Sequence, residues 1–100
     1  MENSSRQSLR KSLAQVIRTA RKLKHLTQED FALISSRTYL SSLERGLKSP
    51  TIDKLEEIAG VLGTSPATLL LAAELIYSDA NPDDLAAKAL DAAKQLTNNN

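Results

Sequence analysis

The chain of 100 residues contains no cysteine and no tryptophan, and His25 is its one histidine. Without thiols there is no disulfide and no thiolate metal site. A single histidine with no carboxylates clustered around it is poor material for a metal site or a catalytic base, so we expect His25 to be a turn residue. The sequence has no glycine-rich phosphate loop, and no base adjoins the serine pairs at 35–36 and 41–42. We therefore expect no enzymatic activity, no cofactor and no metal.

Aromatic residues and long apolar runs are also scarce. The three aromatic residues are Phe31, Tyr39 and Tyr77, so the core must be mostly aliphatic. No run of residues is long and apolar enough to cross a bilayer, and the polar start does not resemble a signal peptide. The length suits one small domain. We expect a soluble, cytoplasmic protein with no membrane partner.

The net charge of +1 is the sum of two very different halves. Residues 1–50 contain ten Lys and Arg against four acidic residues, a balance of +6. Residues 51–100 contain three against eight, a balance of −5. This asymmetry indicates one face for a polyanion and another for a different contact, although a chance scatter of solvated charges would produce the same count.

Apolar residues recur at helical spacing through most of the chain and predict an all-α fold. Helices are expected over residues 8–23, 28–33, 37–45, 52–62 and 66–77, and a sixth over 82–96. The apolar stripe expected in the fourth of these consists of Ile52, Leu55, Ile58, Ala59 and Leu62. The helix ends are marked by residues typical of caps, first helical positions and left-handed terminators: Thr27, Ser36, Thr51, Ser65, Asn81, Pro66, Pro82, Gly46 and Gly63.

Residues 27–46 are predicted to form two short helices joined by a tight turn. Phe31 and Ala32 are the inward candidates of the first helix, and Leu40 and Leu43 share one face of the second. The outward face of the second helix then carries one arginine and three small hydroxyls, namely Arg37, Thr38, Ser41 and Ser42. Such a face is a poor core and is suited to reading base edges in DNA.

Three pieces of sequence, LTQEDFA, SRTYLSSLERG and a following SP, together resemble the helix-turn-helix of the phage-repressor/Cro-like (XRE-family) DNA-binding proteins. The resemblance covers roughly residues 9–77. It implies a lambda-repressor-like DNA-binding domain of five helices, to which the helix over 82–96 is an extra C-terminal element. The joint Leu33-Ile34-Ser35 between the two short helices is shorter than the glycine-containing joint common in the family.

We expect four segments along the chain. Residues 1–7 form a disordered N-terminal arm, and residues 8–77 form the helix-turn-helix domain. Residues 78–97 form a C-terminal helix that docks on its own domain or on a partner, and residues 98–100 are a tail. Apolar residues beyond a single stripe in the last two helices predict a dimer interface made by Leu71, Leu75, Ile76, Leu85 and Leu96.

The chemistry of the outward face assigns roles to its residues. Arg37 can pair with guanine O6 and N7, Thr38 can touch a thymine methyl or a base edge, and Ser42 can contact a base one turn further along. Ser41 and Arg45 suit the phosphate backbone.

The resemblance implies further roles. It adds Gln28 and Lys48 as backbone contacts, with a plain helix-start glutamine and a solvated lysine as the alternatives. Tyr39 matches a family position at the protein–DNA boundary and can equally be half-buried core. The family resemblance also implies a structural ion pair between Arg21 and Glu44, which would hold the first helix against the recognition helix over residues 37–45.

These expectations combine into one function and one alternative. The first is a sequence-specific transcriptional regulator, a repressor, that binds a palindromic operator on double-stranded DNA as a homodimer. The alternative is an antitoxin or adaptor that uses the same fold mainly to bind a protein partner. The acidic second half and the surplus apolar residues Leu71, Leu75 and Ile76 fit that alternative.

Overall fold

The computed structural model describes residues 8–98. No strand occurs within that range, so the all-α fold is confirmed. The expected arm over 1–7 and residues 99–100 of the expected tail lie outside the described residues. The helices are α1 (Leu9–Leu23), a 3-10 helix η1 (Gln28–Phe31), α2 (Arg37–Glu44), α3 (Ile52–Leu62), α4 (Pro66–Tyr77) and α5 (Pro82–Thr97).

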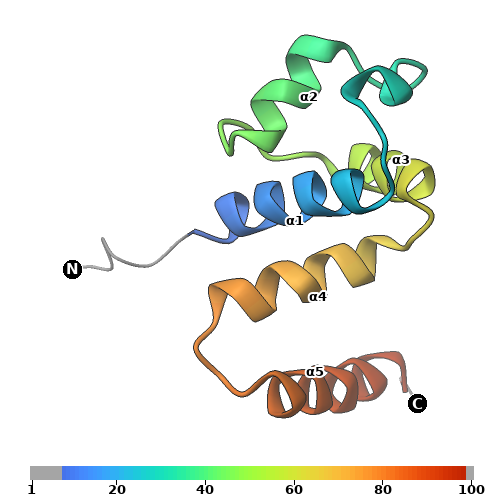
Figure 1. The fold of residues 1–100 in the computed structure, drawn as a ribbon. Helices are drawn as coiled ribbons and strands as arrows, with labels where there is room; N and C mark the ends of the chain where they lie inside the picture. The colour runs from blue at the N-terminus through green and yellow to red at the C-terminus, as the bar shows by residue number, and fades with distance from the viewer. Residues whose placement is uncertain (1–7, 99–100) are drawn as a thin grey trace.

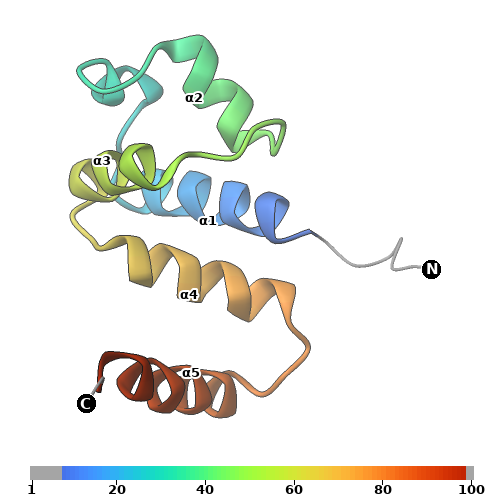
Figure 2. The ribbon, with the colours of Figure 1, turned by 180° about the vertical axis from the view of Figure 1, so that it is seen from behind.

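The helices are stacked around α1, which crosses the middle of the molecule (Figure 1). Helix α2 lies on one side of α1, and α4 lies on the other side and runs antiparallel to α1 (Figures 1 and 2). Helix α5 lies beyond α4, so α4 separates it from the helix-turn-helix. The face of α2 that turns away from α1 is therefore far from the C-terminal helix.

The buried core is aliphatic apart from Phe31, as the composition predicts. Helices α1 to α4 and η1 all contribute to it, whereas α5 contributes no buried residue. Among the described residues no single helix is long and apolar enough to cross a membrane, and α3 and α4 reach that composition only as a pair bent by 97°. The principal core residues are Leu13, Ile17, Phe31, Leu40, Leu43, Leu55, Ile58, Leu62, Leu69 and Ala73.

Local sequence signals place most helix ends where they were predicted. The Ser36 hydroxyl accepts a hydrogen bond from the backbone N–H of Tyr39 and starts α2, and Thr51, Ser65 and Asn81 act in the same way for the following helices. Gly46 and Gly63 end α2 and α3 with φ values of 75° and 72°, a conformation that glycine adopts without strain. His25 follows α1 with φ 59°, which confirms it as a turn residue.

The first helix of the predicted pair is shorter than expected. It is a 3-10 helix that ends at Phe31. The backbone N–H groups of Ile34 and Ser35 both bond to the Phe31 carbonyl, so the short joint forms turns and not a regular α-helix that continues to Leu33. Ala32, expected to point inward, is exposed for the same reason.

The predicted stripe of α3 is wrong at its first position. Ile52 is 73% exposed, whereas the other four members of the stripe are buried. Ile52 is the first residue of α3, directly after the cap, and the helix is buried in the core only from Leu55 onward.

Candidate nucleic-acid interface

Helix α2 is held with one face in the core and the opposite face in solvent. Leu40 and Leu43 are 0% and 1% exposed and fix the inner face. Arg37 and Thr38 are exposed in the first turn, and Ser41 and Ser42 are half-buried beside them. The four residues expected to face outward therefore lie along the accessible side of this helix.

The inner end of α2 is tied to α1 by a bidentate ion pair. Arg21 Nε donates to Glu44 Oε2 at 2.7 Å, and Arg21 Nη2 donates to Glu44 Oε1 at 3.0 Å. The third nitrogen, Nη1, donates to the backbone carbonyl of Leu26 at 2.9 Å. The two side chains are 13% and 4% exposed, so the pair is largely removed from water. The structure thus contains the pair that the family resemblance implies.

The surroundings keep the guanidinium of Arg21 charged. The hydrogen bond to Glu44 raises the pKa of Arg21 above its ordinary value, burial acts in the opposite direction, and the charge of Glu44 adds to the rise. Charged hydrogen bonds of this kind are shorter and stronger than neutral ones.

Gln28 joins the same network from η1. Its Nε2 donates to Glu44 Oε1 at 3.2 Å, so the side chain lies against the end of α2. An amide nitrogen carries two N–H donors, and this bond uses one of them. Gln28 is half-buried, and it links η1 and α2 directly. One carboxylate therefore holds α1, η1 and α2 together.

Two further bonds fix the flanks of the helix-turn-helix. Arg10 Nε of α1 donates to the backbone carbonyl of Gly46 at 2.9 Å, just beyond the end of α2. Lys54 Nζ of α3 donates to the backbone carbonyl of Ile34 in the joint. Helices α1 and α3 thus restrain the unit at both ends.

Tyr39 and Lys48 lie next to each other at the edge of this surface. Tyr39 is half-buried and packs against the core, while Lys48 is exposed in the loop after α2. The Lys48 Nζ atom lies 5.8 Å from the centroid of the Tyr39 ring, within the range of a cation–π contact. Arg45, at the end of α2, is also exposed.

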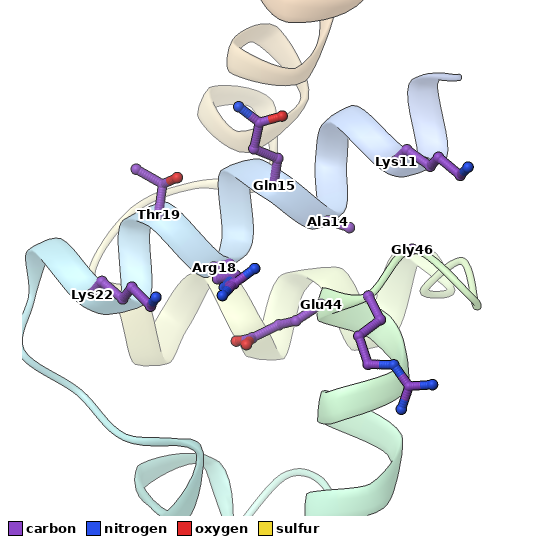
Figure 3. A pocket seen from close by; sticks show the side chains of 9 residues that line it. Lys11, Ala14, Gln15, Arg18, Thr19, Lys22, Glu44 and Gly46 are labelled. Atoms are coloured by element: carbon purple, nitrogen blue, oxygen red, sulfur yellow. The ribbon is translucent and has the colours of Figure 1, made fainter. Parts of the chain in front are cut away.

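A basic cleft of about 600 Å³ lies between α1 and the end of α2. Figure 3 shows Lys11, Arg18 and Lys22 along one side of α1, with Glu44 facing that helix from α2. Arg45 supplies the fourth cation. Glu44 is the one acidic residue of the lining, and its charge is already engaged by Arg21. Within residues 8–98 none of the four cations forms an ion pair.

The basic cleft continues toward the predicted backbone contacts. A smaller depression of about 260 Å³ shares Arg18, Lys22 and Arg45 with it and adds Gln28 and Ser41. Charged residues off the apolar stripe of a helix usually form a solvated face, so periodicity alone does not identify these cations. The spacing of Lys11, Arg18 and Lys22, at i, i+7 and i+11, was the signal that they share one side of the helix.

A helix-turn-helix family model matches residues 17–69, from the middle of α1 into α4. This span contains η1, α2 and the ion pair between Arg21 and Glu44. The chain belongs to the helix-turn-helix family of DNA-binding transcriptional regulators. The resemblance to the XRE-type proteins is thereby confirmed, and the chain is a regulator rather than an enzyme.

Two relatives support this placement. An uncharacterized HTH-type transcriptional regulator, y4dJ of Sinorhizobium fredii (strain NBRC 101917 / NGR234), is 42% identical over an alignment of 64 residues that covers 62% of this chain and 83% of the relative. The crystal structure of the clp gene regulator ClgR from Corynebacterium glutamicum superimposes with a TM-score of 0.68 at 31% identity, covering 91% of this chain and 93% of ClgR. A second ClgR crystal structure has a TM-score of 0.69 and covers 76% of this chain.

The buried ion pair between Arg21 and Glu44 should make a large contribution to the stability of the fold. Replacing Arg21 with Ala should lower the free energy of unfolding by about 3–5 kcal/mol, because the Glu44 carboxylate is left buried without its partner. Urea unfolding followed by circular dichroism measures the loss. Replacing both residues together, Arg21→Met with Glu44→Leu, should cost much less than Arg21→Ala alone, since no buried charge remains.

An exposed pair in the same chain is the control for this measurement. Lys54 Nζ lies 2.9 Å from Glu57 Oε1, and the Glu57 side chain is 50% exposed. Glu57→Gln should therefore cost at most about 1 kcal/mol. If Arg21→Ala stays within about 0.5 kcal/mol of the unmodified protein, the pair does not hold the helices together.

Proposed function

We propose that the protein is a sequence-specific repressor that binds a palindromic operator as a homodimer and reads it with α2. The observation that supports this proposal is the accessible face of α2, which is fixed by buried residues and lies beside a cleft of cations that form no ion pair among residues 8–98. A helix of this kind fits the major groove of DNA. A repressor acts by occupying its operator, so repression needs no part of the chain other than this DNA-binding surface.

The first turn of α2 and the turn after it supply the base contacts in this proposal. Arg37 is the one long charged side chain on the accessible face, and its guanidinium suits O6 and N7 of guanine. Thr38 is exposed beside it and suits a thymine methyl or a base edge. Ser42 lies one turn further along and can donate or accept a hydrogen bond.

The backbone contacts surround this reading face. We assign the phosphate contacts to Gln28, Ser41, Arg45 and Lys48. The cations of α1 in the basic cleft extend the same surface. A phosphate approaching Arg45 would meet Arg18 and Lys22 within the same cleft. Contacts of this type set affinity and orientation, whereas base contacts set sequence preference.

The dimer is proposed to form through α4 and α5. Leu71 and Leu75 are each 37% exposed, Ile76 is 40% exposed and Leu96 is 83% exposed, while Leu85 is half-buried. Leu90, which is not among the five predicted interface residues, adds a further apolar side chain that is 57% exposed. Helix α5 contacts α4 yet buries none of its own residues, and a helix held so weakly gains stability from a partner.

Arg37 and the backbone residues should respond differently to substitution. Arg37→Ala should remove about 1–3 kcal/mol of discrimination at one base pair of each half-site. Lys48→Ala, Arg45→Ala or Arg18→Ala should weaken binding to all duplexes alike and flatten the salt dependence by roughly one unit per subunit. The measurement is a titration of a duplex selected from random DNA, and of a scrambled duplex, at several salt concentrations.

Two outcomes would contradict this assignment. If Arg37→Ala lowers the affinity for both duplexes by the same factor, Arg37 is a phosphate contact and not a reader. If the unmodified protein selects no duplex from random DNA and binds none at low salt, the DNA-binding proposal fails and the alternative of an antitoxin or adaptor is favoured.

The dimer proposal is tested by charge introduced into its apolar face. The unmodified protein should sediment as a dimer at high micromolar concentration, and the double variant Leu75→Asp with Leu85→Asp should sediment as a monomer, because burying the new carboxylates is costly. Leu33→Asp is the control, since Leu33 is fully exposed in the joint, away from α4 and α5. A monomeric unmodified protein, with and without DNA, would contradict the proposal, and a dimer that survives the double substitution would place the interface elsewhere.

A further inference from the structure

An acidic residue stands beside the proposed reading residue. The Glu29 carboxylate, on η1, forms an ion pair with the guanidinium of Arg37 at the first position of α2. The two residues are separated by the short joint, which turns directly after Phe31 and brings η1 to the start of α2. A carboxylate at the edge of a DNA-binding surface is repelled by phosphates and weakens DNA binding unless it has another role.

We propose that Glu29 is a positioning residue for Arg37, which directs the guanidinium to one guanine and weakens binding to DNA that lacks it. This inference rests on the proposed function, because it presumes that Arg37 contacts a base. Glu29 itself touches no base in this account. It acts through the arginine and through its own charge.

Arg37 has enough N–H donors to contact Glu29 and a guanine at the same time. The pair with Glu29 uses the Nη2 nitrogen. A guanidinium carries five N–H donors in a planar fork, and a bidentate contact with guanine requires two of them. A carboxylate on one edge of the fork therefore leaves donors for guanine and restricts the plane of the group. Lysine, a point charge without this fork, could not serve both partners with the same geometry.

The location of Arg37 adds a second reason for the acid. The first turn of a helix carries partial positive charge, which disfavours a cation there. Arg37 is the first residue of α2, and Glu29 supplies the compensating charge from outside the helix. The Glu29 carboxylate thus favours a guanidinium conformation in which Arg37 stays close to η1.

Exposure determines when this contact matters. The Arg37 and Glu29 side chains are 72% and 66% exposed, so in water the pair contributes little to stability. When DNA covers this surface and excludes water, the attraction between the two charges strengthens. The repulsion between Glu29 and the phosphates lowers affinity for every duplex, whereas the orientation of Arg37 by Glu29 strengthens only the contact with the correct base pair. Glu29 therefore lowers the affinity for the wrong sequence without an equal loss on the right one.

The test compares Glu29→Gln, Arg37→Ala and the variant with both changes. Each is titrated against a duplex selected by the unmodified protein from random DNA, against that duplex with single base pairs replaced, and against a scrambled duplex. Arg37→Ala should lower discrimination at one base pair about 10- to 100-fold. Glu29→Gln should lower discrimination at that same pair about 3- to 10-fold and raise affinity for the scrambled duplex about 2- to 5-fold. The combined variant should discriminate no worse than Arg37→Ala alone.

A charge-matched control separates this effect from a general loss of negative charge. Glu74→Gln changes an exposed acid on α4, on the other side of α1 from α2 (Figure 1), and should leave discrimination unchanged. Three results for Glu29→Gln would overturn the role of Glu29 and leave the base contact of Arg37 standing. The first is unchanged discrimination, and the second is a loss of discrimination at a different base pair. The third is a loss that adds fully to the loss caused by Arg37→Ala in the combined variant. Normal discrimination in Arg37→Ala would overturn the base contact itself and the inference with it.

Discussion

The ion pair between Arg21 and Glu44 is the constraint on which the DNA-binding surface depends. It removes two charges from water, and neither charge can be left without the other except at a cost of several kcal/mol. Through the Glu44 carboxylate, α1, η1 and α2 meet at one point, since Gln28 donates to the same group. The orientation of α2 is therefore set at its C-terminal end by charge and along its inner face by buried leucines.

Outside this ion pair, basic and acidic residues lie mostly in different parts of the molecule. The cations of the basic cleft lie beside α2 without acidic partners among the described residues, while most of the acidic residues belong to the second half of the chain. Such an arrangement attracts a polyanion to one side of the molecule. Two acids of η1 lie on the attractive side. Asp30 accepts a hydrogen bond from the backbone N–H of Thr27, and Glu29 is the exception that pairs with Arg37. We attribute that exception to sequence preference, since an entirely basic surface would bind every duplex alike.

Local features of the fold were predictable from the sequence, and features that need the tertiary structure were not. Caps, prolines and glycines act over a few residues, so the ends of most helices followed from the sequence. Arg21 and Glu44 are 23 residues apart, and only the family resemblance joined them. The exposure of Ile52 depends on where α3 meets the core, which periodicity cannot report. The contact between Glu29 and Arg37 arises from the tight turn after η1, and no local rule predicts it.

Selection of bound sites from a random pool of duplex DNA tests the central claim most directly, because it reports preference, symmetry and spacing together. If α2 reads the major groove as one half of a dimer, the enriched sequences should contain two inverted half-sites whose centres lie about 34 Å, one helical turn, or a multiple of that distance, apart. A guanine should be prominent in each half-site. A pool that shows no enrichment after repeated rounds, although the folded protein is present, would contradict the account.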